Sequence, residues 1–292
     1  MIRRVLLAAG AAGVWLAAPL TAQSPSPFAV TTQPATLVRG TVGLITVRAA
    51  AGDLIPSLAG RAADELLHFH QARSGGLTAL IGVPIEGPDS LVATLFPAGP
   101  AGGDSVTVTL RVKGGFYRSE RLEVATKYAK PDTVSQRRIR EEIEQARSIS
   151  RAAHQTPRLW SELFRPPRPG RVTSPFGTPR VLNGEVQSRH LGTDFAGVVG
   201  APVEAANAGV VALVGDFYLA GTVVYVDHGE GLVTGYFHLS RAEVAQGDTV
   251  ARGQVIGRVG QSGRVTGPHL HWIARYGNIS VDPMSLINLG KQ

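Results

Sequence analysis

The most constraining feature of this chain is the alternation of short apolar runs and glycine-containing turns from residue 171 onward. Helical periodicity is almost absent there, and apolar runs of about four to eight residues between turns are typical of strands. Residues 222–227 and 232–237 are two such runs, and the turn at 228–231, which contains two glycines, joins them into a predicted hairpin. Residues 244–257 continue as short strands between glycine turns. The sequence therefore predicts an antiparallel β domain.

The part of the chain before this domain carries a second set of strand patterns. Short apolar stretches separated by Gly, Pro and Asp recur from residue 24 to about 130, and residues 105–112 alternate polar and apolar side chains at period two. Several short strands at this spacing are typical of a small immunoglobulin-like β-sandwich. We therefore expect a mainly β protein with an accessory β-sandwich domain over residues 23–130, in which no pattern indicates catalysis.

Residues 131–165 differ from both β regions and are expected to form a helical linker. Asp132 follows a proline and is a suitable N-cap for a helix. The proline-rich run at 164–170 is typical of a stiff, extended connection. We therefore place the last domain at residues 166–292. Five apolar residues recur at helical spacing, with Arg and Glu between them: Ile139, Ile143, Ala146, Ile149 and Ala153.

The first residues have the three regions of a secretory signal peptide. Arginines at positions 3 and 4 precede an apolar run at 5–20, and small residues at 21–23 offer a cleavage site. We expect residues 1–22 to be a signal peptide and the protein to be exported to the periplasm, the cell envelope or the medium. A membrane span needs about 20 apolar residues, so the run is short for one. Contact with a membrane is expected only through this segment, if it stays uncleaved.

Composition limits the chemistry of the chain. Cysteine is absent, which excludes disulfides and cysteine-ligated zinc or iron–sulfur sites. Any metal site must therefore consist of His, Asp and Glu. The net charge of +7 favours polyanionic partners. The arginines are scattered, however, and the sequence contains no recognition helix, zinc finger or aromatic RNA-binding motif, so we expect no nucleic-acid partner.

Histidines and one aspartate of the last domain supply the candidate site. His190 and Asp194 lie close together in the sequence, and His269 and His271 are two apart on a predicted strand, so their side chains point to the same face. Catalytic zinc takes three N or O ligands plus a water, and two histidines with one carboxylate are such a set. His190, Asp194 and one of the paired histidines are the candidate ligands. Further histidines, among them His238 at a predicted strand end, remain for proton transfer.

The other histidines are expected to lie outside the site. His68 and His70 repeat the H-x-H spacing, but no acidic residue stands near them at matching spacing, so we interpret both as structural. His228 lies in the tight turn of the predicted hairpin and is also interpreted as structural. His154, at the end of the predicted helix, is expected at the surface.

A series of short motifs runs through the last domain in one order and spacing. They are Arg171-Val172-Thr173-Ser174-Pro175-Phe176-Gly177, His190-x-Gly192-x-Asp194-Phe195-Ala196, Gly200-Ala201-Pro202-Val203-x-Ala205, Asp227-His228-Gly229-x-Gly231, Tyr236-Phe237-His238-Leu239-Ser240, Gly247-Asp248-x-Val250, Gly253-Gln254-x-Ile256-Gly257 and Thr266-Gly267-Pro268-His269-Leu270-His271-Trp272. Through them, residues 171–287 resemble the lysostaphin-type (LytM-like) zinc metallopeptidases, a family of cell-wall endopeptidases. The resemblance implies a barrel-sandwich β fold for this domain.

The resemblance also implies a role for each candidate residue. His190 and Asp194 match the first two zinc ligands of the family, and His271 matches the third, so one zinc ion per chain is expected. His238 and His269 match its two catalytic histidines. Such roles agree with zinc chemistry, since zinc lowers the pKa of bound water from about 15.7 to about 7. His269 would take the water proton, and His238 would stabilise the oxyanion or protonate the leaving amine.

One further aromatic residue has two open interpretations. Tyr236 stands two residues before His238, on the same face of a regular strand. It either lines the substrate groove or packs as an ordinary strand aromatic.

Three other functions share features with this sequence. The glycine-turn pattern also occurs in lipoyl and biotinyl carrier domains, but these need a lysine on a hairpin, and Lys291 is the only lysine after Pro131. The alternatives that stay open are a non-enzymatic activator of a cell-wall amidase and a secreted general metalloprotease. We expect a secreted zinc metalloendopeptidase whose partners are the stem or cross-link peptides of peptidoglycan.

Overall fold

The computed structural model of the chain describes residues 28–49, 55, 57–72, 75–97, 104–184 and 186–289. The described chain is mainly β, which confirms the predicted fold class. The predicted signal peptide, residues 1–22, lies outside the described residues. Among the helices of the described ranges, none is long and apolar enough to cross a membrane.

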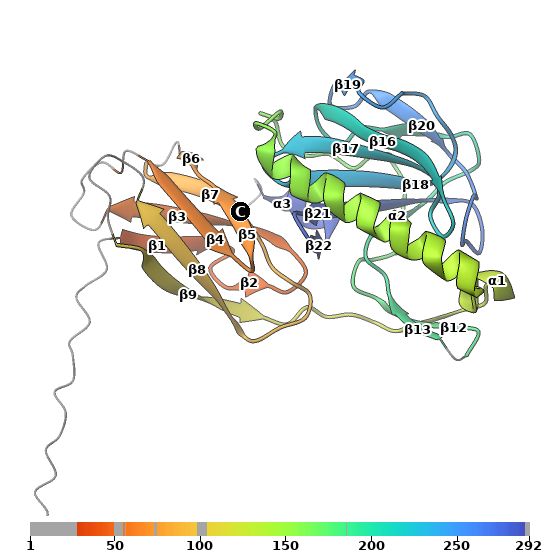
Figure 1. Cartoon of the computed structure of the whole chain (residues 1–292), viewed down its shortest axis with the longest axis horizontal. Coiled ribbons are helices and arrows are strands. Elements are labelled where there is room, and N and C mark those ends of the chain that lie inside the picture. Colours follow the sequence, from red (N-terminus) through yellow and green to blue (C-terminus); the bar gives the residue numbers. More distant parts are fainter. Residues whose placement is uncertain are drawn as a thin grey trace, which may run out of the picture.

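Two sheets form the N-terminal part of the protein and share one core (Figure 1). Ile45 and Ile81 of one sheet and Leu95 of the other are fully buried in that core. The first sheet contains, in order, β1 (Phe28–Gln33), β3 (Val42–Ala49), β7 (Leu77–Gly82) and β6 (His70–Gln71). The second contains, in order, β2 (Leu37–Val38), β9 (Val106–Lys113), β8 (Ser90–Pro97), β4 (Leu58–Ala62) and β5 (Glu65–His68). Buried and more exposed side chains alternate along β4, because successive side chains point to opposite faces.

A larger antiparallel sheet forms the C-terminal part. The predicted hairpin is present as β17 (Gly221–Gly229) and β18 (Leu232–Ala242). The main path runs β11 (Val172–Ser174), β14 (Thr193–Ala196), β21 (His269–Tyr276), β18, β17, β16 (Gly209–Phe217) and β19 (Thr249–Val250). β15 (Pro202–Glu204) pairs with β20 (Val255–Val259), which also pairs with β18, and β22 (Ile279–Val281) pairs with β21. Three short strands form a separate sheet: β10 (Glu120–Leu122), β12 (Pro179–Leu182) and β13 (Val186–Arg189).

Strand β18 changes its partner halfway along. Its first half, residues 232–237, pairs with β21, and its second half, from Leu239 to Ala242, pairs with β20. His238 lies between the two halves with φ of 61°, and the pairing with β17 is irregular at the same place. A non-glycine residue in this left-handed region is uncommon, and bulges of this kind change the direction in which a side chain points. The fold therefore turns His238 away from the direction that a regular strand would give it.

The predicted helix is present as α2 (Thr133–Ala152), preceded by α1 (Thr126–Ala129) and followed by the 3₁₀ turn η1 (Ala153–Gln155). Asp132 caps α2, since its side chain accepts a hydrogen bond from the backbone N–H of Ser135. Ala146 and Ala153 are buried against side chains of the large sheet, and Figure 1 shows α2 lying across that sheet. The helix is therefore packed on the C-terminal sheet along its apolar face.

The proline-rich run that follows is also docked on the C-terminal sheet. Phe164 is buried in the main core, where it contacts Trp160 and His228 edge to face. The backbone N–H of Arg165 donates to the carbonyl of Ala206. These residues contain no helix or strand, and they pack against the C-terminal part of the protein. The domain limits at 23–130, 131–165 and 166–292 remain a proposal.

The N-terminal sheets contact the C-terminal part through buried polar groups. The Glu65 carboxylate bonds to His154 at 2.9 Å and accepts from the backbone N–H of Asn278 at 2.7 Å. His154 also bonds to His68 at 2.9 Å, and its side chain is only 7% exposed. The expectation that His154 lies at the surface is therefore wrong, because a carboxylate and a second imidazole from the N-terminal sheet cover it. The short helix α3 (Pro283–Asn288) adds to this contact, since Ser285 accepts from the N–H of Val42.

We predict that Glu65→Gln lowers the free energy of unfolding by about 1–3 kcal/mol at pH 7, because a buried charged hydrogen bond is lost. Burial acts to raise the pKa of Glu65, but the hydrogen bonds from His154 and Asn278 outweigh it and hold the pKa below its usual 4.5. A lowered folded-state pKa gives stability that is present above about pH 4.5 and is lost as pH falls through the folded-state value. Denaturant unfolding at pH 7 and below pH 4 should therefore show that the difference in free energy of unfolding between wild type and variant is smaller in acid. Glu141→Gln, on the exposed side of α2, is the matched control, and an equal loss in both variants would contradict the prediction.

Candidate metal centre

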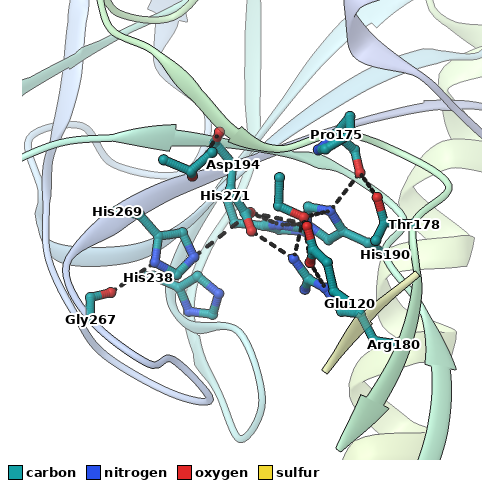
Figure 2. Close-up of polar contacts among 12 residues, drawn as sticks. Glu120, Pro175, Thr178, Arg180, His190, Asp194, His238, Gly267, His269 and His271 are labelled. Atoms are coloured by element: carbon teal, nitrogen blue, oxygen red, sulfur yellow. Dashed lines mark hydrogen bonds and ion pairs between the residues drawn. The ribbon is translucent and has the colours of Figure 1, made fainter. Parts of the chain in front are cut away.

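The three predicted ligands come from neighbouring elements at one edge of the large sheet. Asp194 lies on β14 directly opposite His271 of β21, so the antiparallel register makes them cross-strand partners. His190 follows β13 and reaches the same place from the adjoining loop. Figure 2 shows the three side chains turned toward one another. The structure thus brings together the residues whose spacing predicted a metal site.

The ligand atoms of these residues form a tight triangle. His190 Nε2 lies 3.0 Å from Asp194 Oδ1 and 2.9 Å from His271 Nδ1, and His271 Nδ1 lies 2.7 Å from Asp194 Oδ1. His190 and Asp194 are buried. Burial acts to raise the pKa of Asp194, but the hydrogen bonds and charges of His190 and His271 hold it well below its usual range. Burial lowers the pKa of His271 to about 4. At neutral pH Asp194 is therefore an ionised carboxylate and the imidazole of His271 is neutral.

Backbone carbonyls orient the imidazole of His190. Its Nδ1 lies 2.9 Å from the carbonyl oxygen of Pro175, and a carbonyl only accepts hydrogen bonds, so Nδ1 carries the proton. The lone pair of the neutral ring is then on Nε2, which points at Asp194 and His271. A second hydrogen bond that fixes the tautomer in this way is a regular feature of metal-ligating histidines.

The second oxygen of Asp194 is held by residues that sequence reasoning missed. Arg180 of β12 donates to Asp194 Oδ2 at 2.8 Å and to the hydroxyl of Ser174 at 2.8 Å. Glu120 of β10 accepts from Arg180 at 3.3 Å and from Ser174 at 2.9 Å. Oδ1 is thereby left as the oxygen that faces both histidines. No local pattern identifies these residues, because β10 reaches β12 from before α2.

The two predicted catalytic histidines lie beside the triangle. His269 Nε2 is 3.7 Å from Asp194 Oδ1, and its Nδ1 donates to the carbonyl of Gly267 at 2.8 Å. His238 Nδ1 donates to the carbonyl of Ser262 at 2.8 Å, and its ring lies 5.0 Å from that of His269. In neutral rings held this way the lone pair is on Nε2. Burial lowers the pKa of His238 well below its usual value, and neighbouring His271 and His269 lower it further.

Two other residues singled out in the sequence, Tyr236 and His228, lie away from these five. Tyr236 is fully buried, and its hydroxyl accepts from the backbone N–H of Ala206, so it packs in the core and does not line the groove. The bulge at His238 separates the two side chains that a regular strand would place on one face. His228 is buried between the carbonyl of Ala208 and the hydroxyl of Thr234. Its position agrees with a structural role.

A cleft of about 530 Å³ opens over the candidate ligands. Glu120 and Leu122 of β10 line it, so the segment that joins the N-terminal sheets to α2 forms part of its wall. A second hollow of about 330 Å³ lies between α2 and the sheet, and it shares Phe237 and His271 with the first. The groove around the candidate site is therefore built from both the last domain and the segments before it.

The donor set of the three candidate ligands suits a metal ion. Among the described residues, His190, Asp194 and His271 form the one group of at least three potential ligands whose donor atoms lie within 4.8 Å of one another. Two imidazole nitrogens and one carboxylate oxygen suit zinc, and three protein ligands leave a fourth position for water. Arg180 occupies Asp194 Oδ2, so the carboxylate presents a single oxygen. The residues present fit a catalytic zinc ion.

Comparison with known proteins finds similarity that centres on the C-terminal part of the chain. Residues 188–283 match the model of Peptidase family M23. Peptidoglycan DD-endopeptidase ShyA of Vibrio cholerae is 44% identical over 104 residues, which are 35% of this chain and 24% of that protein. DD-carboxypeptidase/endopeptidase Mpg of Neisseria meningitidis is 41% identical over 116 residues, which are 40% of this chain and 27% of that protein. The chain thus spans about a quarter of the length of these curated relatives.

The similarity to solved structures extends beyond the last domain. A Pseudomonas aeruginosa structure assigned to peptidase M23 superposes with a TM-score of 0.66 at 27% identity. The alignment covers 86% of this chain and 95% of that one, so it includes part of the chain that precedes residue 166. The predicted resemblance to lysostaphin-type metallopeptidases is confirmed.

We predict that Gly192→Ala weakens zinc binding about 10- to 100-fold, the usual effect of disturbing a metal-ligand environment. A Cβ at this position would lie 2.6 Å from Cε1 and 2.7 Å from Nε2 of His271, and 2.7 Å from the backbone oxygen of Trp272. The ring of His271 must therefore move. Zinc affinity is measured by competition with a chromophoric chelator. Gly114→Ala is the control, since nothing lies within 4 Å of its added Cβ. Unchanged affinity in Gly192→Ala would remove His271 from the ligand set.

Proposed function

We propose that the protein is a zinc metalloendopeptidase that hydrolyses peptide bonds in the stem or cross-link peptides of peptidoglycan, and the match of residues 188–283 to Peptidase family M23 supports the proposal. The observation that carries the proposal is the convergence of His190 Nε2, Asp194 Oδ1 and His271 Nδ1. The names of ShyA and Mpg support the substrate class. Peptidoglycan lies outside the cytoplasm, so this substrate and the predicted signal peptide both favour export to the periplasm or cell envelope.

His190, Asp194 and His271 would hold one zinc ion per chain. When bound there, zinc lowers the pKa of a water ligand to about 7 and polarises the carbonyl of the substrate. The chain contributes orientation: Pro175 fixes the tautomer of His190, and Arg180 fixes the carboxylate of Asp194. Preorganised ligands of this kind need little rearrangement during the reaction.

His269 would act as the general base. Its Nδ1 proton is engaged by the carbonyl of Gly267, so the lone pair on Nε2 faces the side of Asp194. An attacking water near the three ligands can pass its proton to this nitrogen. A positioned general base of this type contributes about 10²–10⁴-fold in rate.

His238 would act at the carbonyl oxygen or at the leaving nitrogen of the substrate. Burial keeps its ring neutral at pH 7, with Nδ1 bonded to Ser262. Once Nε2 receives the proton that His269 takes from the attacking water, it becomes a donor that can stabilise the oxyanion or protonate the leaving nitrogen.

Two alternatives differ from this proposal in measurable ways. A non-enzymatic activator of an amidase has no need of a complete ligand set, so the five residues together favour an enzyme. A general metalloprotease would release peptides from casein as readily as from peptidoglycan. Incubation with purified peptidoglycan and with casein, followed by mass spectrometry of the products, separates these functions.

We predict about one zinc per purified chain, and loss of hydrolysis on chelation that zinc restores. The double variant His190→Ala plus His271→Ala should hold no zinc, and Asp194→Ala should lose zinc affinity together with activity. Elemental analysis and muropeptide cleavage on the same preparations give both values. Full zinc occupancy in the double variant would overturn the ligand assignment.

We predict that His238→Ala and His269→Ala keep zinc and the fold but lose about 10²–10⁴-fold in turnover. The reason is that neither ring belongs to the ligand triangle, while both offer Nε2 beside it. His70→Ala is the control, because its imidazole is 41% exposed and bonds to Glu230 away from the cleft. Near-normal cleavage by both variants would contradict the mechanism. Zinc loss in His269→Ala with zinc retention in His271→Ala would show that the pair is reversed.

A further inference from the structure

One charged side chain that lines the cleft, Arg264, takes no part in the proposed hydrolysis. Three arginines line the cleft, and two of them are paired: Arg180 with Asp194 and Glu120, and Arg189 with Glu86 at 2.6 Å. The third, Arg264, has no ion pair or side-chain hydrogen bond with any residue that the structure describes. It follows β20 in the loop that leads to the H-x-H strand β21.

The backbone around Arg264 is fixed beside His238. The N–H of Arg264 donates to the carbonyl of Leu219 at 2.8 Å, and the N–H of His238 donates to the carbonyl of the next residue, Ala220, at 2.9 Å. Ser262, two residues before Arg264, accepts the Nδ1 hydrogen bond of His238. A Cβ added at Gly263 would lie 2.5 Å from backbone atoms of Leu219 and Gly221, so the loop that carries Arg264 packs directly against this turn. The backbones of Arg264 and His238 are thus bonded to the same turn, residues 219 and 220.

The guanidinium of Arg264 is half-buried, and no described carboxylate pairs with it. Burial lowers its pKa, and the nearby charge of Arg180 lowers it further, with no acidic group acting in the opposite direction. The two carboxylates that line the cleft, Glu120 and Asp194, are both bonded to Arg180. A zinc ion would add positive charge to the same cleft. A partly desolvated, unpaired charge is costly unless a ligand supplies its counter-charge.

We propose that Arg264 binds a carboxylate of the substrate, on the carbon that carries the leaving nitrogen of the scissile bond. The inference rests on the proposed function and adds a specificity determinant to it. A guanidinium donates two parallel hydrogen bonds to a carboxylate, which makes it selective for that group over a neutral amide. His238 is the proposed donor to the leaving nitrogen, and Arg264 lines the same cleft from the loop that holds His238, so the carboxylate on the carbon next to that nitrogen is the substrate group that we assign to Arg264. In a cross-link formed through an amine of diaminopimelate, this carbon carries a carboxyl group, whereas the corresponding carbon of lysine carries none.

The test uses the full-length zinc-loaded protein and a pair of synthetic cross-linked peptides. Both contain a D-Ala–diaminopimelate bond, and they differ only in the carboxyl group on the carbon that bears the scissile nitrogen, which is free in one and a carboxamide in the other. We expect wild type to cleave the free acid with a kcat/KM about 10- to 100-fold higher, because the amide leaves the arginine unpaired. Arg264→Gln should lower kcat/KM about 10- to 100-fold on the acid and change it little on the amide. The ratio of kcat/KM for the acid to that for the amide should therefore approach one. Arg264→Lys should give an intermediate preference.

The control is Arg241→Gln, which removes the same charge from an exposed side chain paired with Glu243. It should keep the wild-type preference, which excludes an effect of net charge. Equal cleavage of the two peptides by wild type, or a full preference retained in Arg264→Gln with normal zinc content and melting temperature, would overturn the inference while leaving the proposed function intact. Cleavage of neither peptide by zinc-loaded wild type that does cleave purified peptidoglycan would also overturn the inference, whereas failure to cleave both the peptides and purified peptidoglycan would overturn the proposed function. The comparison of acid and amide on wild type needs no variant, so it holds even where a substitution disturbs the loop.

Discussion

The antiparallel pairing of β14 with β21 is the interaction on which the candidate site depends. It places Asp194 opposite His271 on one face, and Phe195 opposite Leu270 on the other. Phe195, Leu270 and Trp272 are buried in the main core, and burial of each large apolar side chain is worth about 1.5–3 kcal/mol. A slip of one residue would turn these side chains to the cleft and the ligands to the core. The hydrophobic core therefore fixes the register, and the register fixes the metal ligands.

Backbone carbonyls connect this framework to the chemistry of the imidazoles. His190, His238 and His269 each direct Nδ1 at a main-chain oxygen, and each thereby presents Nε2 to the cleft. The three acceptors lie outside the β-strands, at Pro175, Ser262 and Gly267. The strands determine the positions of these imidazole rings, and the loop carbonyls determine which ring nitrogen carries the lone pair. Both are needed, because an imidazole with the other tautomer would offer a proton where a ligand or a base must offer a lone pair.

The sequence predicts the parts of the site that depend on local geometry. His269 and His271 share a face because strand side chains alternate at period two, and His190 and Asp194 stand close together in one motif. The same period fails at His238, since it would place that residue beside Tyr236. The change of partner along β18 depends on two other strands, β20 and β21, and no local pattern encodes it. Contacts such as that between Glu120 and Arg180, 60 positions apart, depend in the same way on the complete fold. The amphipathic face of α2 was predictable, but its partner sheet was not.

Segments expected to be accessory or connecting are part of the walls and supports of the cleft. Glu120 shares Arg180 with Asp194, so a carboxylate from before the helix competes for the same guanidinium that orients the proposed metal ligand. Because that guanidinium is divided between two carboxylates, its charge is largely balanced within the protein. Arg264, on the loop before β21, has no such balance among the described side chains. The cleft therefore contains one arginine whose charge supports the ligands and is balanced by carboxylates, and one whose charge no described carboxylate balances. An anionic group of a substrate gains most at the second arginine, which lies on the loop that also holds the imidazole of His238.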